Sequence, residues 1–279
     1  MFEVSAPSAL QWLIGVELAR FRNEAKVSLS ELAETTGISR AKLGHLETGR
    51  SMQYPADIRK ILKACGVDRE HVDRIVLLSG RADEASWLGD WTDVMSDWLR
   101  TIVGLESLAR HEFVFEPIVL PGLVQIEDYA RELTQAASRV RPDRAERLVE
   151  FRMQRARLLS KEEPLECHAI FNEQALRLRI GNQDLLNAQY RHLLQLADQP
   201  NVTIQVVRPE AGPHAAPNGQ FVLLDFADAR SIAYIELQDA AVFVDDSARV
   251  RTYTLSTQSL ARVALSPGES ATLIESLIR

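Results

Sequence analysis

The sequence predicts an α+β protein: an all-helical N-terminal domain, a connecting helix, and a C-terminal α/β domain with a mainly antiparallel sheet. Two observations predict this class. Helical periodicity with helix-capping residues fills the first eighty residues, whereas beyond residue 112 amphipathic helices alternate with short runs rich in β-branched and aromatic residues. We therefore expect a helical domain over 1–80, a connecting helix over 81–111 and a C-terminal domain over 112–279.

The first helices are predicted by their caps. Apolar spacing over 12–23 indicates one helix, and Ser28, followed three residues later by Glu31, forms a capping box that starts the next. Gly37 is placed to end that second helix, and Ser39 to cap a third one that closes at Gly49. The result is two short helices joined by a tight turn.

Two more helices complete the N-terminal domain. Pro55 lies in the first turn of a fourth helix that ends at Gly66, and a fifth runs from Asp68 to about Leu78. A single helix is then expected from Asp83 to Arg110. It would place three indoles on one face, either as a core-facing stripe or as a dimer seam: Trp87, Trp91 and Trp98.

The C-terminal domain mixes both kinds of pattern. Residues 113–122 and 164–171 are strand-like, and three amphipathic stretches predict helices at 123–137, 142–160 and 184–197. Short turns separate the last four strand-like runs, which favours an antiparallel meander over 202–208, 219–226, 231–238 and 240–246. Two helices close the chain, the second starting at Ser266.

Composition excludes several classes. The chain has 279 residues, 46% hydrophobic and 25% charged, which is typical of a globular protein. Acidic and polar residues interrupt its N-terminal segment, and no apolar run is long enough for a membrane helix. We expect the protein in the cytoplasm, on the nucleoid when bound to DNA. Cys65 and Cys167 lie far apart, so we expect reduced thiols and no disulfide, metal or cofactor.

The charge is unevenly distributed. The net charge is −7, which disfavours indiscriminate adhesion to nucleic acids or membranes. Residues 20–63 nevertheless carry nine Lys or Arg against five acidic residues, a local charge of +4. A locally basic module therefore belongs to an otherwise acidic chain.

The third predicted helix has the character of a recognition helix. Leu43 and Leu46 are spaced to pack inward, which leaves Arg40, Lys42 and His45 outward. Such side chains near the start of the second helix of a helix-turn-helix reach base edges in the major groove. Arg40 is the best bidentate donor among them. The alternative is a helical bundle without a DNA partner, in which Lys42 and other cations are merely solvated and His45 covers the domain surface.

The stretch ELAETTGISRAKLGHLETGR resembles the helix-turn-helix of Cro/C1 repressor-type (XRE) regulators, through its Glu-Leu-Ala, Gly, capping Ser and Leu-Glu-x-Gly elements. The resemblance implies base contacts from Arg40, Ala41 and His45, and phosphate contacts from three further residues: Ser28, Lys42 and Arg50. Gly44 departs from the pattern and costs the helix about 1 kcal/mol relative to alanine.

The rest of the chain resembles the C-terminal domain of actinomycete WhiJ-type regulators, also called Scr-type or antitoxin-like, through GLESLARHEFVFEPIVLPGLVQIEDYA, FNEQAL, GQFVLLDF, AYIE and SPGESATLI. Its most specific piece is Pro121 to Gln125, while Ile126 departs from the more usual Thr. The resemblance implies a transcription factor that binds a small partner protein encoded nearby. Because a single helix-turn-helix reads few base pairs, regulators of this type usually bind as two-fold dimers, so we expect a homodimer on a pseudo-palindromic operator. The alternative is an antitoxin-like interaction module that neutralises a small partner without DNA.

No catalytic constellation is apparent, so we expect no enzyme. Cys167 and His168 are neighbours on a predicted strand and therefore point to opposite faces. Glu173 and Glu236 lie beside apolar strands, where a carboxylate needs a partner. His214 lies in a long loop that either binds something or forms a rigid hairpin. These three are the candidate ligand or partner site: Glu173, His214 and Glu236.

Overall fold

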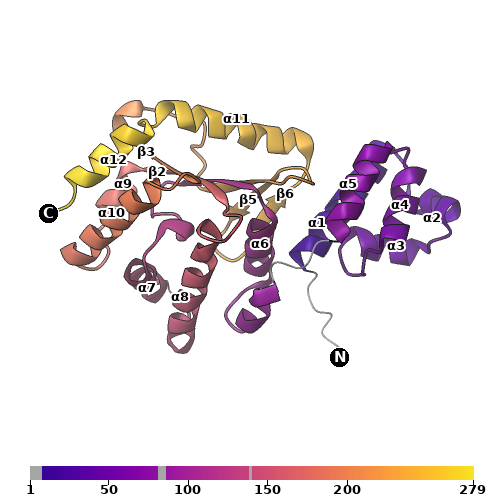
Figure 1. Cartoon of the computed structure of the whole chain (residues 1–279), viewed down its shortest axis with the longest axis horizontal. Helices are drawn as coiled ribbons and strands as arrows, with labels where there is room; N and C mark the ends of the chain where they lie inside the picture. Colours follow the sequence, from indigo (N-terminus) through magenta and orange to yellow (C-terminus); the bar gives the residue numbers. More distant parts are fainter. Residues whose placement is uncertain (1–7, 81–85, 138–139) are drawn as a thin grey trace. The chain divides into compact units, whose positions relative to one another are not determined.

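The computed structural model describes residues 8–80, 86–137 and 140–279 (Figure 1). The chain forms two compact units. Unit 1 contains the residues up to Thr92 with Ser96–Leu108 and Phe226–Arg230, and unit 2 contains Asp93–Met95, Ala109–Asp225 and Ser231–Arg279. Helices build the first unit and a six-stranded sheet with helices builds the second, which confirms the α+β class.

Unit 1 begins with five α-helices: α1 Ala9–Glu24, α2 Leu29–Thr36, α3 Arg40–Glu47, α4 Pro55–Ala64 and α5 Arg69–Ser79. Their ends follow the caps read from the sequence. Ser28 and Glu31 form the capping box, Gly37 ends α2 at φ +71°, and the Ser39 side chain accepts a hydrogen bond from the Lys42 amide. The core contains one or more side chains from each helix, including Leu13, Leu18, Leu32, Leu43, Leu46, Ile58, Leu62 and Ile75.

The expected single helix over 83–110 is wrong. A 3-10 helix, η1, covers Ser86–Trp91, and a separate helix, α6, covers Asp97–Leu108; residues 83–85 lie outside the described part of the chain. Ser96 starts the new helix, because its carbonyl accepts from the Arg100 amide and its hydroxyl from the Leu99 amide. The three tryptophans therefore lie on two elements, and the spacing that placed them on one helix face does not apply.

Unit 2 contains six strands: β1 His111–Glu116, β2 Glu166–Asn172, β3 Val202–Val207, β4 Phe221–Asp225, β5 Ile232–Glu236 and β6 Ala241–Val244. Their order is β3-β2-β1-β4-β5-β6. The three strands β3, β2 and β1 are parallel and the other pairings are antiparallel, with Val114 of β1 opposite Ala169 of β2 and Val222 of β4.

The predicted meander therefore holds for β4, β5 and β6 but is wrong for β3. Two helices, at Glu173–Arg177 and Gln183–Ala197, connect β2 to β3, and such a crossover brings the new strand in parallel to the previous one. The turn residues after β3 do not indicate that the next strand, β4, pairs with β1, along the edge of β1 that faces away from β2.

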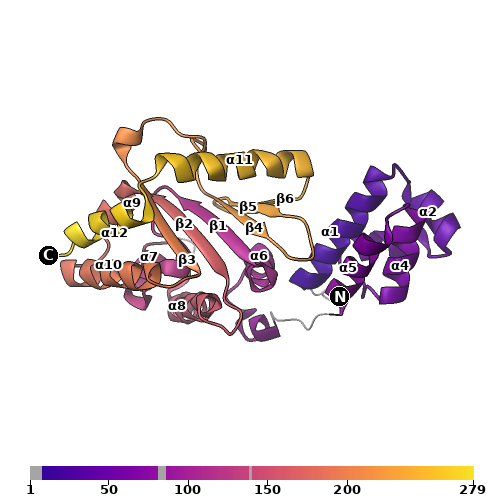
Figure 2. The ribbon, with the colours of Figure 1, turned by 45° about the horizontal axis from the view of Figure 1, so that its top comes forward.

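Six helices accompany the sheet: α7 Glu127–Ala136, α8 Pro142–Ala156, α9 Glu173–Arg177, α10 Gln183–Ala197, α11 Ser247–Val263 and α12 Pro267–Ser276. Short 3-10 segments lie at Gly122–Val124 (η2), Arg157–Leu159 (η3) and Pro209–Ala211 (η4). Helix α11 covers one face of the sheet, and α7, α8 and α10 lie on the other side (Figure 2).

Alternating side chains bury both faces of the sheet. Phe113, Phe115 and Phe221 join Val250 and Leu260 of α11 in one hydrophobic cluster. Neighbouring positions along β1 and β2 point the opposite way and are also buried: Val114, Ala169 and Phe171.

Candidate nucleic-acid interface and C-terminal pocket

Helix α3 presents a polar outer face. Leu43 and Leu46 are fully buried, whereas Arg40, Ala41 and His45 are exposed. Within the described residues, the side chains of Arg40 and His45 make no hydrogen bond or ion pair. The three residues expected to contact bases therefore share one accessible helical surface.

A largely buried ion pair holds the end of α3 against α1. Arg22 Nε donates to Glu47 Oε1 at 2.5 Å, and Arg22 Nη2 donates to Glu47 Oε2 at 2.9 Å. Hydrogen bonding to Glu47 raises the pKa of Arg22 above its ordinary value. The same guanidinium donates to the Val27 carbonyl, so it also fixes the chain before α2. Arg22 thus sets the position of the helix that carries Arg40.

Close backbone contact reinforces this arrangement. A Cβ on Gly15 would lie 2.5 Å from the Glu47 carbonyl oxygen, and one on Gly49 would lie 2.9 Å from the Gln11 backbone. The buried Gln53 side chain donates to the carbonyls of Gln11 and Leu46, at 2.8 Å each. Sequence reasoning missed Arg22, Gly15 and Gln53, because their partners lie far along the chain and no local pattern marks them.

The three side chains that are expected to contact phosphates differ in whether another residue of the protein already binds them. Arg50 is exposed, and its side chain makes no ion pair within the described residues. Lys42 Nζ already pairs with Asp57 of α4 at 2.7 Å. The Ser28 hydroxyl accepts from the Glu31 amide as the α2 cap, which leaves its proton available for a phosphate.

Two apolar side chains beside α3 also escaped the sequence reasoning. Met52 and Tyr54, in the segment between α3 and α4, are 58% and 60% exposed. Apolar residues within a polar loop were the available signal.

In unit 2 the structure brings two of the three candidate ligand residues together. Glu173 and His214 line one pocket of about 190 Å³ with Asn172, Val207 and Arg208 among their neighbours. The pocket lies where the parallel strands β2 and β3 end, which is the edge where open sheets with parallel strands commonly bind ligands.

Glu173 is a buried carboxylate between two arginines. Arg177 Nε donates to its Oε1 at 2.7 Å, and Arg208 Nε donates to its Oε2 at 3.1 Å. Burial alone would raise the pKa of Glu173, but these hydrogen bonds outweigh it and lower the pKa below its ordinary value. Glu173 therefore orders the two guanidinium groups on either side of it.

The loop that carries His214 is not a hairpin, contrary to one of the two interpretations. It leaves β3 at one edge of the sheet and enters β4, which β2 and β1 separate from β3. His214 Nδ1 accepts from the Ala216 amide at 3.2 Å, and the ring contacts Phe115 edge-on. Nδ1 as acceptor places the proton of a neutral ring on Nε2.

Glu236 does not join this pocket. It is exposed at the end of β5, and strands β1 and β4 separate β5 from β2 in the sheet. Burial, and then the negative charge of Glu236, raise the pKa of Glu116 at the end of β1 to about 8. Arg155 and Arg152 act on Glu116 in the opposite direction. Glu236 is thus part of a charged cluster with Glu116, Arg152 and Arg155.

No helix in the described part of the chain has the length and apolar character needed to cross a membrane. No group of three or more His, Cys, Asp or Glu in the described ranges is arranged to hold a metal ion.

Comparison with known proteins matches two families to different parts of the chain. Residues 13–75 match a family described as a helix-turn-helix domain, which contains α2 and α3 and supports a DNA-binding regulator. Residues 99–276 match a family described as a domain of unknown function (DUF5753). No curated protein and no solved structure matches the chain. Since this second match covers more than half of the sequence, the chain belongs to the DUF5753 family and carries a helix-turn-helix domain before it.

Proposed function

We propose that this protein is a sequence-specific transcriptional regulator in which α3 reads base edges in the major groove. The observation that carries the proposal is the outer face of α3, where Arg40 and His45 are exposed on a helix that Glu47 anchors to Arg22. A rigidly held helix is what base readout needs, because misplaced donors cannot form two hydrogen bonds with one base.

Each residue on this face has a distinct role. Arg40 donates two hydrogen bonds to a guanine edge, His45 contacts a base further along, and Ala41 packs against a thymine methyl group. Arg50, Lys42 and the Ser28 hydroxyl contact phosphates and set the register. Lys42 contributes less than Arg50, because it must leave or share its ion pair with Asp57.

We further propose a homodimer on a pseudo-palindromic operator. One recognition helix reads few base pairs, so regulators of this kind gain specificity by placing two helices one DNA turn apart. The C-terminal domain then binds a small partner protein or effector, for which the Glu173–His214 pocket is the candidate site. This places the protein in the cytoplasm, on the nucleoid when bound to DNA, and assigns it no catalytic role.

A second function is favoured by exposed apolar side chains on unit 1. Met52, Tyr54 and Leu77 are 58%, 60% and 71% exposed, and exposed apolar side chains can contact a partner protein. In this alternative the helical module docks a partner protein and neutralises it without DNA.

Salt dependence separates the two functions. DNA fragments that the purified full-length chain retains from a random library would be sequenced, and the affinity for the enriched site measured at several salt concentrations. A DNA regulator loses affinity steeply, with log affinity falling by roughly 0.9 per neutralised phosphate for each unit of log salt. Absence of any enriched site, with a salt-insensitive protein partner recovered instead, would support the alternative.

A further inference from the structure

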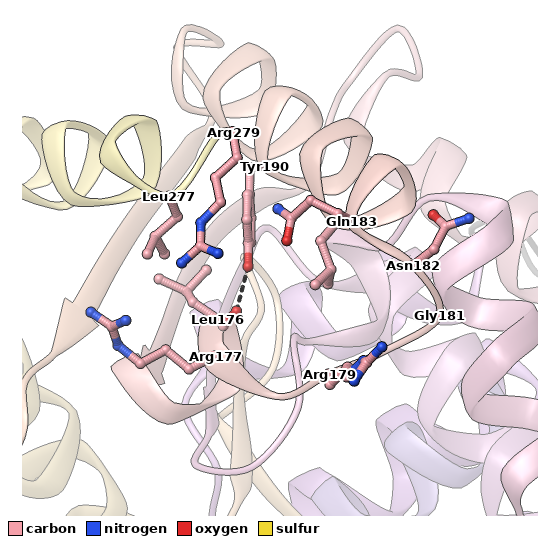
Figure 3. A pocket seen from close by; sticks show the side chains of 10 residues that line it. Leu176, Arg177, Arg179, Gly181, Asn182, Gln183, Tyr190, Leu277 and Arg279 are labelled. Atoms are coloured by element: carbon pink, nitrogen blue, oxygen red, sulfur yellow. Dashed lines mark hydrogen bonds between the residues drawn. The ribbon is translucent and has the colours of Figure 1, made fainter.

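A second pocket in unit 2 lies between α9, α10 and the segment that follows α12 (Figure 3). Its volume is about 290 Å³. Three arginines line it, each from a different segment: Arg177 from α9, Arg179 from the turn before α10, and Arg279 after α12. No acidic residue is among the residues that line it.

Two of these three guanidinium groups form no ion pair within the part of the chain that the structure describes. Arg177 Nη2 lies 2.6 Å from Glu173 Oε1, which does not line this pocket, so the charge of Arg177 has a partner. Within the described residues, Arg179 and Arg279 form no ion pair. Guanidinium groups without a carboxylate partner, gathered at one concavity, form a site for an anion of matching charge.

The polar framework around the pocket is fixed by hydrogen bonds. Asn187, which is buried, donates to the Arg279 carbonyl at 2.7 Å and accepts from the Arg279 amide at 3.1 Å. Asn182 Oδ1 accepts from the Leu185 amide as the α10 cap, which leaves the Asn182 side-chain amide free to donate. These hydrogen bonds fix the positions of Arg279 and Asn182, while the Arg279 guanidinium and the Asn182 side-chain amide can still donate to a ligand.

Tyr190 lines the pocket, and the positive charges nearby affect the pKa of its hydroxyl. Its hydroxyl is buried and donates to the Leu176 carbonyl at 2.5 Å. Burial raises the pKa of Tyr190, while the positive charges of Arg177 and Arg279 act on it in the opposite direction. Both guanidinium groups therefore lie close enough to influence one phenolic oxygen.

We propose that this pocket binds a small organic dianion, with phosphate or carboxylate groups between Arg179 and Arg279 and a short apolar part against Leu186 and Leu277. Two guanidinium groups without an ion pair can each bind one anionic group of the ligand, and the planar guanidinium fork fits phosphate and carboxylate oxygens alike. The volume lies at the small end of the range for ligand pockets, so the ligand is small. The site does not depend on the proposed DNA binding.

Calorimetric titration of the full-length protein tests this proposal. Phenyl phosphate, inorganic phosphate and succinate would be titrated at one fixed ionic strength, with phenol as the neutral control. Saturable binding of a dianion and none of phenol is expected. Phenyl phosphate binding more tightly than inorganic phosphate identifies a phosphate monoester as the better ligand, and succinate binding more tightly identifies a dicarboxylate.

Variants locate the site. Arg179→Gln and Arg279→Gln should each weaken binding about tenfold or more, because each removes hydrogen bonds from a charged donor. Arg191→Gln is the matched control: it removes the same charge from an exposed position on α10 that does not line the pocket, and binding should be unchanged. The proposal is overturned if no dianion binds saturably at millimolar concentration, or if Arg191→Gln weakens binding as much as the pocket variants do.

Discussion

At the scale of single residues, Glu47 shows how a motif residue acts without touching DNA. Its two carboxylate oxygens accept from Arg22, and its side chain is only 10% exposed. The glutamate of the Leu-Glu-x-Gly element therefore fixes the end of the recognition helix, while Arg40, Ala41 and His45 face outward.

Arg22→Ala should lower the free energy of unfolding of unit 1 by about 1–3 kcal/mol, because it leaves a largely buried carboxylate without its donors. Denaturant unfolding of Arg22→Ala, Glu47→Ala and the double variant measures the coupling. Arg59→Ala is the control, since its ion pair with Asp73 is exposed and should contribute at most about 1 kcal/mol. Equal losses for Arg22→Ala and Arg59→Ala would refute the anchoring role.

Glu116 predicts a pH dependence in unit 2. Its pKa is about 8 in the folded chain against an ordinary 4.5, so between these values the folded state keeps a proton that the unfolded state releases. This contribution therefore makes stability fall as pH rises through that window. Glu116→Gln should flatten the fall and stabilise the protein at pH 8 by about 1–3 kcal/mol, after allowance for partial exposure.

Thermal unfolding of the wild type and Glu116→Gln between pH 5 and pH 8 measures this effect. Glu163→Gln, at an exposed glutamate in the same unit, should leave the wild-type profile unchanged. A profile for Glu116→Gln that runs parallel to the wild type would show that this carboxyl does not titrate in the window.

At the scale of elements, the sequence predicted what local interactions determine. The capping box at Ser28, the αL turn at Gly37 and the start of α12 at Ser266 each depend on residues no more than four apart, and all are present. The partners of Arg22 and the neighbours of β3 depend on contacts between distant segments, which periodicity does not encode.

The candidate site residues likewise include some that local spacing predicts and others whose positions depend on the order of the strands. The outward face of α3 follows from helical spacing, so Arg40, Ala41 and His45 are exposed as expected. Glu173 and His214 meet in one pocket only because β2 and β3 are parallel neighbours, while Glu236 lies elsewhere because β1 and β4 intervene. Apolar flanks alone could not distinguish these two glutamates.

Two glycines give opposite predictions for substitution within helices. A Cβ on Gly44 meets nothing within 4 Å, so Gly44→Ala should stabilise α3 by about 1 kcal/mol. Gly15→Ala should destabilise unit 1 by about 1–3 kcal/mol, because its Cβ would overlap the Glu47 carbonyl. Denaturant unfolding of both variants checks the signs. A Gly44→Ala variant that is more stable but binds DNA more weakly would show that the surface of α3 at Gly44 approaches the DNA.

At the scale of the whole molecule, the proposed dimer follows from how little one recognition helix reads. Sedimentation at micromolar concentration should give twice the 31.3 kDa of a single chain, at least when the operator is present. A single-chain mass both with and without operator would refute the homodimer, and the protein would then have to gain specificity from another partner.

The charge distribution sets the expected response to salt. The chain as a whole is acidic, at −7, so the basic residues around α3 must provide the phosphate contacts. Arg50→Ala should reduce the slope of log affinity against log salt by about one, on any sequence. Lys42→Ala should reduce it less, because Asp57 already balances part of that charge. Equal slopes for wild type and Arg50→Ala would remove Arg50 from the interface.

If α3 is the reading helix, Arg40 contacts a base edge, and Arg40→Ala decides whether it does. Affinity of the wild type and this variant would be measured on the enriched operator and on a scrambled duplex of the same composition. Loss of a bidentate base contact predicts about 1–3 kcal/mol lower affinity on the operator and a far smaller loss on the scrambled duplex. If Arg40→Ala weakens both duplexes equally, Arg40 contacts phosphate and the assignment of α3 as the reading helix is contradicted.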